Sequence, residues 1–405
     1  MKKLSYILLF FSLFPGLLNA QDKQLFKVTF SGFVKTDFIY DSRQTVNARE
    51  GHFLLYPSPE KLDLNGEDIN AGSNFNILSI QSRLKVSVEG PEVLGAKTSS
   101  VVEGAFFGNS NSDINGFRLR HAFVKLDWKS NSVIAGQYWH PFFVEEVFPG
   151  VISFNTGVPF KPFSRNPQLR VSHMLDNVKI SFTVASQRDF SGIGPNGTSS
   201  EYLRNSALPI LNITAKYLSK KYVFGAGINY EKLKPELETT SGYKSDAAIG
   251  STAFTGFGKY QGEKLSLKVE STYGENMYDL MMLGGYGVSG TDPVTNEKHY
   301  TAVKTFSIWT DIAYGKKIKP GLFVGYTENL GADTQITGDV YSRGSNIHDM
   351  FRISPRIEYN LSPLVLGLEV EYTSAAYGTP NSKLVVEDYE SVSNTRILTA
   401  VYYYF

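Results

Sequence analysis

The side chains of this sequence best suited to bind a ligand are basic residues on the polar faces of segments in which apolar and polar residues alternate. Successive side chains of a β-strand point to opposite sides, so such a segment gathers its charges on one face. Guanidinium groups held on a wall offer forked donors to carboxylate or phosphate groups. The basic residues on these polar faces are Arg83, Lys85, Arg170, Arg352 and Arg356. The pattern favours contact with small anionic solutes.

Two further arginines, Arg118 and Arg120, join this set if their segment contains a β-bulge near His121. The apolar residues change parity at that point and continue from Ala122 onward on the other parity. A bulge inserts one extra residue and would place both arginines on the polar side. Acidic residues share these faces and could neutralise the arginines, so a charge-balanced wall stays open as an alternative; they are Glu89, Glu103, Glu358, Glu369 and Glu371.

Several other kinds of chemistry are not supported. There is no cysteine, which removes disulfides and thiolate sites, and the 6 histidines show no paired metal-ligand spacing. GYGVSG at 285–290 lacks the βαβ context of a dinucleotide loop. In LDLNGEDIN at 62–70, Gly66 stands at the wrong offset for a calcium loop, although a looser external cation site stays open. We therefore expect no catalytic residue, cofactor or metal, and the net charge of +1 gives no sign of nucleic-acid binding.

Alternation with a period of two recurs along nearly the whole chain and predicts about sixteen strands. In the segment 78–89, for example, Leu78, Leu84 and Val88 share one parity and polar residues share the other. The predicted strands lie near 24–40, 76–90, 97–109, 117–129, 131–139, 167–174, 177–186, 208–218, 221–231, 248–261, 263–274, 302–315, 319–330, 347–360, 363–374 and 394–405.

The connections between these strands alternate between short turns and long polar segments. Short turns lie at 129–131, 175–177, 219–221, 261–263 and 360–363, and long segments near 41–75, 108–116, 139–166, 187–207, 232–246, 275–301, 331–346 and 375–393. This places all short turns at one end of an up-and-down sheet, an asymmetry typical of outer-membrane barrels. We therefore expect an all-β fold, a transmembrane antiparallel β-barrel with a wet lumen. A large secreted β-sandwich is the alternative.

The two ends of the chain agree with this fold. MKK, an apolar run and Ala20 predict a signal peptide over 1–20, which leaves a single barrel domain over 21–405. The run is short for a ~30 Å hydrocarbon core and contains Pro15 and Gly16, which argues against an anchor helix. The chain ends on Tyr402 to Phe405, where Tyr403 and Phe405 share a face with the apolar residues before them. We expect a final membrane strand that pairs with the first.

One long connection, 139–166, is too apolar for a free external loop, since Trp139 to Pro167 contains six phenylalanines. We expect it to fold inward as a constriction loop, with the phenylalanines as anchors. Its charged residues would then face the channel; they are Glu145, Glu146, Lys161 and Arg165. Packing at a subunit contact or over the mouth of the barrel is the alternative.

Four segments carry a family resemblance: FSGFVKTDFIYD (30–41), RLRHAFVKLDW (118–128), AGQYWHPFF (135–143) and NPQLRVSH (166–173). They resemble the DcaP-like outer-membrane porins. The resemblance implies a trimeric barrel of sixteen strands for small, mostly anionic solutes, and its motifs cover roughly the first 175 residues. The predicted first strand leaves no room for the N-terminal coiled coil of some members of that group, which puts a role of that segment in doubt here.

These features predict a porin in the outer membrane of a Gram-negative bacterium, forming a water-filled channel for passive diffusion of small hydrophilic solutes, with a preference for anions as a hypothesis. Expected partners are outer-membrane lipid, lipopolysaccharide, two further copies of the chain, and the barrel-assembly machinery through Phe405. One alternative is a barrel enzyme of the phospholipase or protease type, although no constellation of nucleophile and base is recognisable. The other is a binding or adhesion barrel with a plugged lumen.

Overall fold

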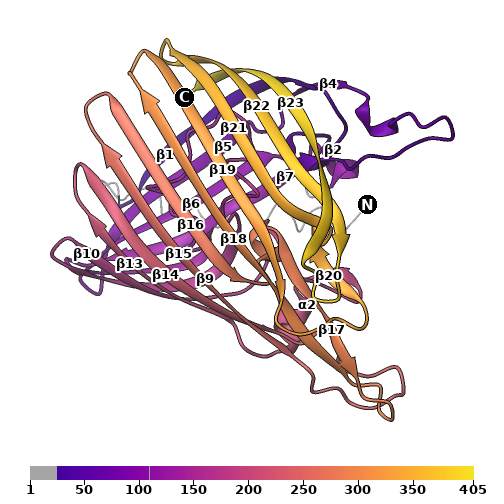
Figure 1. The fold of residues 1–405 in the computed structure, drawn as a ribbon. Coiled ribbons are helices and arrows are strands. Elements are labelled where there is room, and N and C mark those ends of the chain that lie inside the picture. Colours follow the sequence, from indigo (N-terminus) through magenta and orange to yellow (C-terminus); the bar gives the residue numbers. More distant parts are fainter. Residues whose placement is uncertain (1–24, 109) are drawn as a thin grey trace, which may run out of the picture.

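The chain forms one closed antiparallel β-barrel of sixteen strands with almost no helix (Figure 1). We describe residues 25–108 and 110–405 of a computed structural model. The predicted signal peptide, 1–20, lies outside the described residues. The barrel strands are β1 (Lys27–Asp41), the interrupted pair β4 (Asn74–Leu78) and β5 (Arg83–Val93), β6 (Ala96–Phe106), β7 (Phe117–Asp127), β8 (Asn131–Trp139), β9 (Arg165–Leu175), β10 (Val178–Ala185), β13 (Ile210–Leu218), β14 (Tyr222–Leu233), β15 (Ile249–Gln261), β16 (Leu265–Glu275), β18 (Lys298–Tyr314), β19 (Ile318–Ala332), β21 (Ile347–Asn360), β22 (Leu364–Pro380) and β23 (Val386–Tyr404).

The barrel closes where β1 pairs with β23, in a register that runs from Phe33 opposite Tyr404 to Asp41 opposite Arg396. Phe405 extends the pairing, because its N–H donates to Gly32 O at 3.2 Å and its carbonyl accepts from Gly32 N at 3.0 Å. The pairing thus extends to the last residue of the chain, so the wall has no open strand edge facing lipid at this seam. The predicted pairing of the last strand with the first is confirmed.

Alternation decides which side of the wall each residue faces. In β1, Val34, Phe38 and Tyr40 are exposed on the outside, whereas Lys35 and Asp37 are buried inside. The period of two thus separates a lipid-facing apolar surface from a polar interior. Short turns join the strands at one end of the barrel, the upper left of Figure 1. One of them is closed by a hydrogen bond of 2.8 Å from Leu361 N–H to Leu364 O. We call this the short-turn end and the opposite one the long-loop end.

The elements outside the wall lie in the long connections. They are β2 (Thr45–Ala48), β3 (Phe53–Pro57), β11 (Ile193–Gly194), β12 (Gly197–Thr198), β17 (Gly284–Thr291), β20 (Val340–Arg343), helix α2 (Glu201–Asn205) and the 3-10 turns η1 (Ile69–Ala71), η2 (Asn111–Asp113) and η3 (Tyr278–Leu280). Strand β17 pairs with β18 and β20 and lengthens the wall at the long-loop end. Part of the predicted loop 275–301 is therefore strand, which is a correction.

The bulge expected near His121 is present. Glu103 stands opposite His121 and Gly104 stands opposite Leu119, so Arg120 is the extra residue. Arg120 and His121 are consequently both buried inside the barrel, while Leu119 is exposed outside. The prediction that a bulge restores the polar orientation of Arg118 and Arg120 is confirmed.

Candidate functional site

Residues 140–164, the connection between β8 and β9, fold into the barrel and cross its interior. Three of its carbonyls accept hydrogen bonds from distant strands of the wall: Ile152 O from Lys35 Nζ at 2.8 Å, Val158 O from Arg352 at 2.7 Å, and Phe160 O from Ser307 Oγ at 2.7 Å. Arg352 and Ser307 stand on β21 and β18, across the barrel from β8 and β9, and Lys35 stands on β1, about a quarter of the way round from β8. We call this segment the constriction loop.

Charges buried between the loop and the wall fix its course. Lys161 Nζ lies 2.7 Å from Glu270 Oε2 on β16, with both side chains inaccessible to solvent. Asn155 donates to Glu371 at 2.8 Å, and Glu369 accepts the backbone N–H groups of Ile152 and Ser153. An unpaired buried charge would be strongly unfavourable, so each pair specifies one position for the loop.

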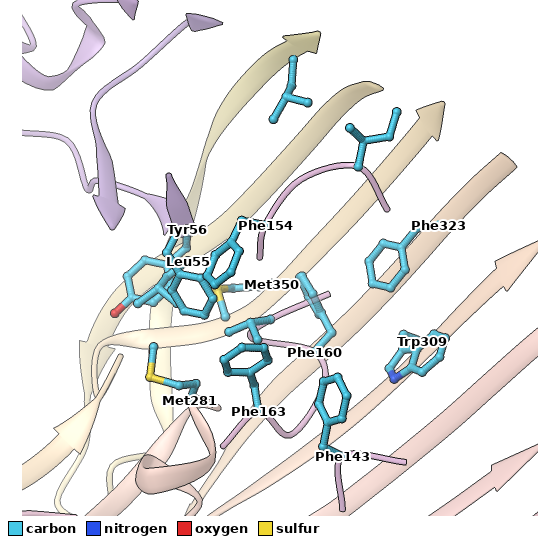
Figure 2. Packing of buried hydrophobic residues seen from close by; sticks show 14 of the residues in the cluster. Leu55, Tyr56, Phe143, Phe154, Phe160, Phe163, Met281, Trp309, Phe323 and Met350 are labelled. Atoms are coloured by element: carbon cyan, nitrogen blue, oxygen red, sulfur yellow. The ribbon is translucent and has the colours of Figure 1, made fainter. Parts of the chain in front are cut away.

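A second inward segment packs on the constriction loop. The hairpin β2–β3 follows β1, and all five residues of β3, Phe53–Pro57, are buried. Its Phe53 ring lies 5.4 Å from Phe154 and 5.6 Å from Phe163. Figure 2 shows Leu55 and Tyr56 beside the phenylalanines of the constriction loop, with Met281 from a third long connection nearby. An apolar cluster therefore fills part of the barrel interior, which corrects the expectation of a lumen occupied by water alone.

Arg352 joins the two inward segments. Its guanidinium donates to Val158 O at 2.7 Å and to Leu55 O at 2.9 Å, and it lies 3.4 Å from Glu371. Arg356, also buried, forms a forked pair with Asp311 at 2.7 and 3.2 Å. Both arginines, predicted to line the pore, are buried and paired: Arg352 holds the two inward segments, and Arg356 pairs with Asp311 of β18.

Space for solutes remains beside the strands that precede and follow the constriction loop. A cavity of about 190 Å³ lies among β5, β6, β7 and β8, and its lining includes Arg83, Lys85, Glu103, Tyr138 and Trp139. Within it Arg120 lies 2.5 Å and Arg83 3.9 Å from Glu103. Lys85 stands opposite Glu103 in the register of β5 and β6, but the two arginines pair with that carboxylate and Lys85 forms no ion pair with any residue that the structure describes.

A neighbouring cavity shares Glu145 with the first one and is lined by Arg170, Lys179 and Lys216. Lys216 pairs with Glu146 at 2.7 Å, whereas Glu145 accepts only a hydrogen bond from Tyr138. Lys179 stands directly opposite Lys216 in the register of β10 and β13. Like charges placed opposite each other destabilise a sheet, so this pair has a cost in the empty barrel.

The same motif recurs further round the wall, where Lys259 of β15 stands opposite Lys268 of β16. Among the described residues neither lysine forms an ion pair, and Lys268 donates to Phe148 O of the constriction loop at 2.8 Å. Asp311 stands opposite Lys268 in the register of β16 and β18 but is paired with Arg356. Lys125 and Lys319 also face the interior but are paired, with Asp127 at 2.7 Å and Glu358 at 2.9 Å. Most of these lysines lie toward the short-turn ends of their strands.

The predicted site residues thus divide into two groups. Lys161, Arg165, Arg352 and Arg356 are buried and paired inside the packed loops, and Arg118 shares Asp189 with Arg165. The residues that line the two cavities are Arg83, Lys85, Arg120, Glu145 and Arg170. Glu146 is partly exposed and pairs with Lys216, which lines the second cavity. The sequence analysis did not include Lys179, Lys259 and Lys268. Their positions on the predicted strands share the parity of the polar face, and this signal could have identified them.

The described residues contain no group of three or more side chains arranged to hold a metal ion. In the segment 62–70, Asp63 accepts the N–H groups of Asn65 and Glu67, and Asp68 pairs with Arg43 at 2.6 Å. The Lys61 N–H, followed by the Arg43 guanidinium, holds the pKa of Asp68 below its ordinary value. In the part of the chain described, no helix has the length and apolarity to span a bilayer.

Comparison with solved structures agrees with this architecture, although no family model and no curated protein matches the sequence. The outer membrane channel DcaP of Acinetobacter baumannii is 16% identical, with a TM-score of 0.69, over 95% of this chain and 99% of that one. The chain has the porin fold. OmpT of Vibrio cholerae, an outer-membrane protein, follows at 14% identity and TM-score 0.57, covering 95% and 99% of the two chains. An anion-selective porin from Comamonas acidovorans is 12% identical, with TM-score 0.56, covering 94% and 100%. The predicted resemblance to DcaP-like porins is confirmed at the level of fold.

Proposed function

We propose that this protein is an outer-membrane porin through which small hydrophilic solutes diffuse passively, with a preference for anions. The observation that carries the proposal is the balance of free charge inside the barrel. Lys85, Lys179, Lys259 and Lys268 are partly exposed and form no ion pair among the described residues. The acids that stand opposite Lys85 and Lys268, Glu103 and Asp311, are paired with arginines. Glu145 lines both cavities without an ion pair. The other acids without an ion pair among the described interior residues, Glu231, Asp279 and Glu369, are buried. Fixed cations along a narrow path attract anions and repel cations.

The opposed lysines support this proposal because they have a cost in stability. A sheet gains nothing from placing Lys179 opposite Lys216 or Lys259 opposite Lys268. An anion that lies against both ammonium groups of a pair would relieve this repulsion. The Comamonas porin of the same fold is described as anion-selective, which agrees with this assignment.

The decisive experiment measures the zero-current potential of purified protein in a planar bilayer under a tenfold gradient of potassium chloride. We expect a potential of the sign produced by chloride moving down its gradient, and a cation-driven potential would disprove the preference. Conductance steps grouped in threes would support a homotrimer. Vibrio cholerae OmpT, which has a similar fold, is described in a trimer form.

A plugged binding barrel is the second candidate, because the apolar cluster around Phe53, Phe154 and Phe163 fills part of the barrel interior. A barrel closed by this cluster would insert into the bilayer and conduct no ions. For the enzymatic alternative, no described histidine hydrogen-bonds both a carboxylate and a serine hydroxyl. A phospholipase assay on the refolded protein tests that alternative directly.

A further inference from the structure

An apolar groove of about 320 Å³ opens on the outer surface of the barrel at the long-loop end of β9, β10 and β13. Its floor includes Pro167 and Val184. Val184 pairs with Leu169, which is exposed on the lipid-facing side, and Pro167 stands two residues before Leu169 on the same face. The groove is therefore continuous with the membrane-facing surface and is separate from the lumen.

Helix α2 and the turn after it form the other wall of the groove. Leu203 packs inward, while Arg204 and Ala207 are exposed beside the opening. The guanidinium of Arg204 forms no hydrogen bond or ion pair with any residue in the described part of the chain. The groove thus combines an apolar floor with a free cation at its rim.

A second free cation flanks the groove from the adjacent strand. Leu211 stands opposite Tyr230 in the register of β13 and β14. Two residues further toward the long-loop end, the chain reaches Pro209 on one side and Lys232 on the other, and Pro209 lines the groove. Lys232 shares the outward parity of Tyr230 and is exposed. Arg204 and Lys232 therefore both stand at the outer edge of the lipid-facing wall, where headgroups meet solvent.

We propose that this groove binds a phosphorylated glycolipid of the lipid A class from the outer leaflet, with an acyl chain along Pro167 and Val184 and a phosphate held by Arg204 and Lys232. The lipid-facing position supplies acyl chains at high local concentration, and the apolar lining suits them. Arginine binds phosphate through a forked pair of donors, and lysine adds a point charge. A zwitterionic phospholipid would fill the apolar floor but would leave the two cations without a net anionic partner.

The test uses full-length protein washed free of lipid in detergent and titrated with purified diphosphorylated lipid A, with bound lipid counted by native mass spectrometry. Two disrupting variants are compared with wild type: the double variant Arg204→Glu with Lys232→Glu, and Ala207→Phe, which fills the groove and leaves its charge unchanged. Lys220→Glu, at an exposed turn on the short-turn end, is the matched control. Heat-modifiable gel mobility verifies that each variant forms a barrel.

We expect both disrupting variants to bind lipid A about tenfold more weakly than wild type, because one loses the contacts of the phosphate and the other loses the site of the acyl chain. The control should bind lipid A like wild type. Phosphatidylethanolamine should be retained weakly by all four proteins. Equal lipid A binding by wild type and both disrupting variants would overturn the proposal, as would equal retention of phosphatidylethanolamine and lipid A by wild type. If Ala207→Phe dissociates the oligomer without weakening lipid A binding, the groove is a contact between copies and the proposal fails. Conductance does not enter any of these outcomes, so they are independent of the proposed pore function.

Discussion

Lys161 Nζ donates a 2.7 Å hydrogen bond to Glu270 Oε2, and solvent reaches neither side chain. Replacing Glu270 by Gln leaves the Lys161 ammonium buried without an anionic partner. We expect a loss of about 3–5 kcal/mol of stability, together with noisier single-channel currents because the constriction loop loosens. Denaturant unfolding and bilayer recordings measure the two effects.

The matched control for this variant is Glu263→Gln. Glu263 pairs with Lys316 at 3.5 Å, but both side chains are largely exposed, at 83% and 68%. Removing that pair should change stability by about 0–1 kcal/mol. Equal effects of the two substitutions would show that the buried pair does not hold the loop.

Reversing the charge of Lys179 should reduce the preference for anions. Lys179→Glu replaces an unpaired cation with an acid beside Lys216 and Arg170, so the ratio of anion to cation permeability should fall a few-fold. Adding Lys259→Glu should reduce it further. Zero-current potentials give the ratio, and Lys61→Glu, in an exposed external segment, should leave it unchanged.

Arg352→Lys should separate the two inward segments. A single ammonium cannot reproduce the fork that bonds Val158 O and Leu55 O, so one buried carbonyl loses its partner at a cost of about 1–3 kcal/mol. We expect faster amide exchange in the hairpin β2–β3, measured by mass spectrometry. The exposed Arg188→Lys serves as the control, and unchanged exchange in the hairpin would contradict the bridging role.

Deleting Phe405 should impair closure of the barrel. The residue forms both backbone hydrogen bonds with Gly32 that end the seam between β1 and β23. Each unsatisfied backbone group at a lipid-facing edge is costly, so the folded fraction should fall. Heat-modifiable gel mobility after refolding measures it. Tyr403→Phe keeps the backbone and the ring and should fold like wild type.

Acid should release the external segment 58–72. The pKa of Asp68 is lowered by the Lys61 N–H and the Arg43 guanidinium, so its contribution is present above its ordinary pKa and is lost as pH falls through the lowered value. A spin label at Leu64→Cys, the single thiol in the chain, should become more mobile in that range. With Asp68→Asn added, the label should be mobile already at neutral pH. If the mobility of the label does not change with pH in either the Leu64→Cys protein or the variant that also carries Asp68→Asn, Asp68 does not hold the segment.

The wall of the barrel was predictable because alternation is a local signal. Residues such as Val34, Lys35 and Phe38 differ in polarity according to the side that they face, so the sequence shows the strand directly. The hairpin strand Phe53–Pro57 gave no such signal, since all five residues are buried and its two faces do not differ in burial. The sequence therefore predicts only a long polar connection near 41–75.

The interior was only partly predictable. The phenylalanines of 139–166 indicated an inward fold, but the partners that hold the loop lie far along the chain: Glu270 is 109 residues from Lys161, and Arg352 is 194 residues from Val158. No local pattern specifies such pairings. Parity likewise placed arginines inside the barrel but could not separate Arg352, which is buried among loop carbonyls, from Lys179, which faces a cavity.

The constriction loop also braces the cylinder from within. It leaves the wall between β8 and β9 and is fastened to β16, β18, β21 and β1, so it connects β8 and β9 to strands that are not their neighbours in the wall. A barrel without such a crossing segment resists flattening of its cross-section through the wall alone. We therefore expect the cross-section of this barrel to deform less under lateral pressure in the membrane than that of an empty cylinder.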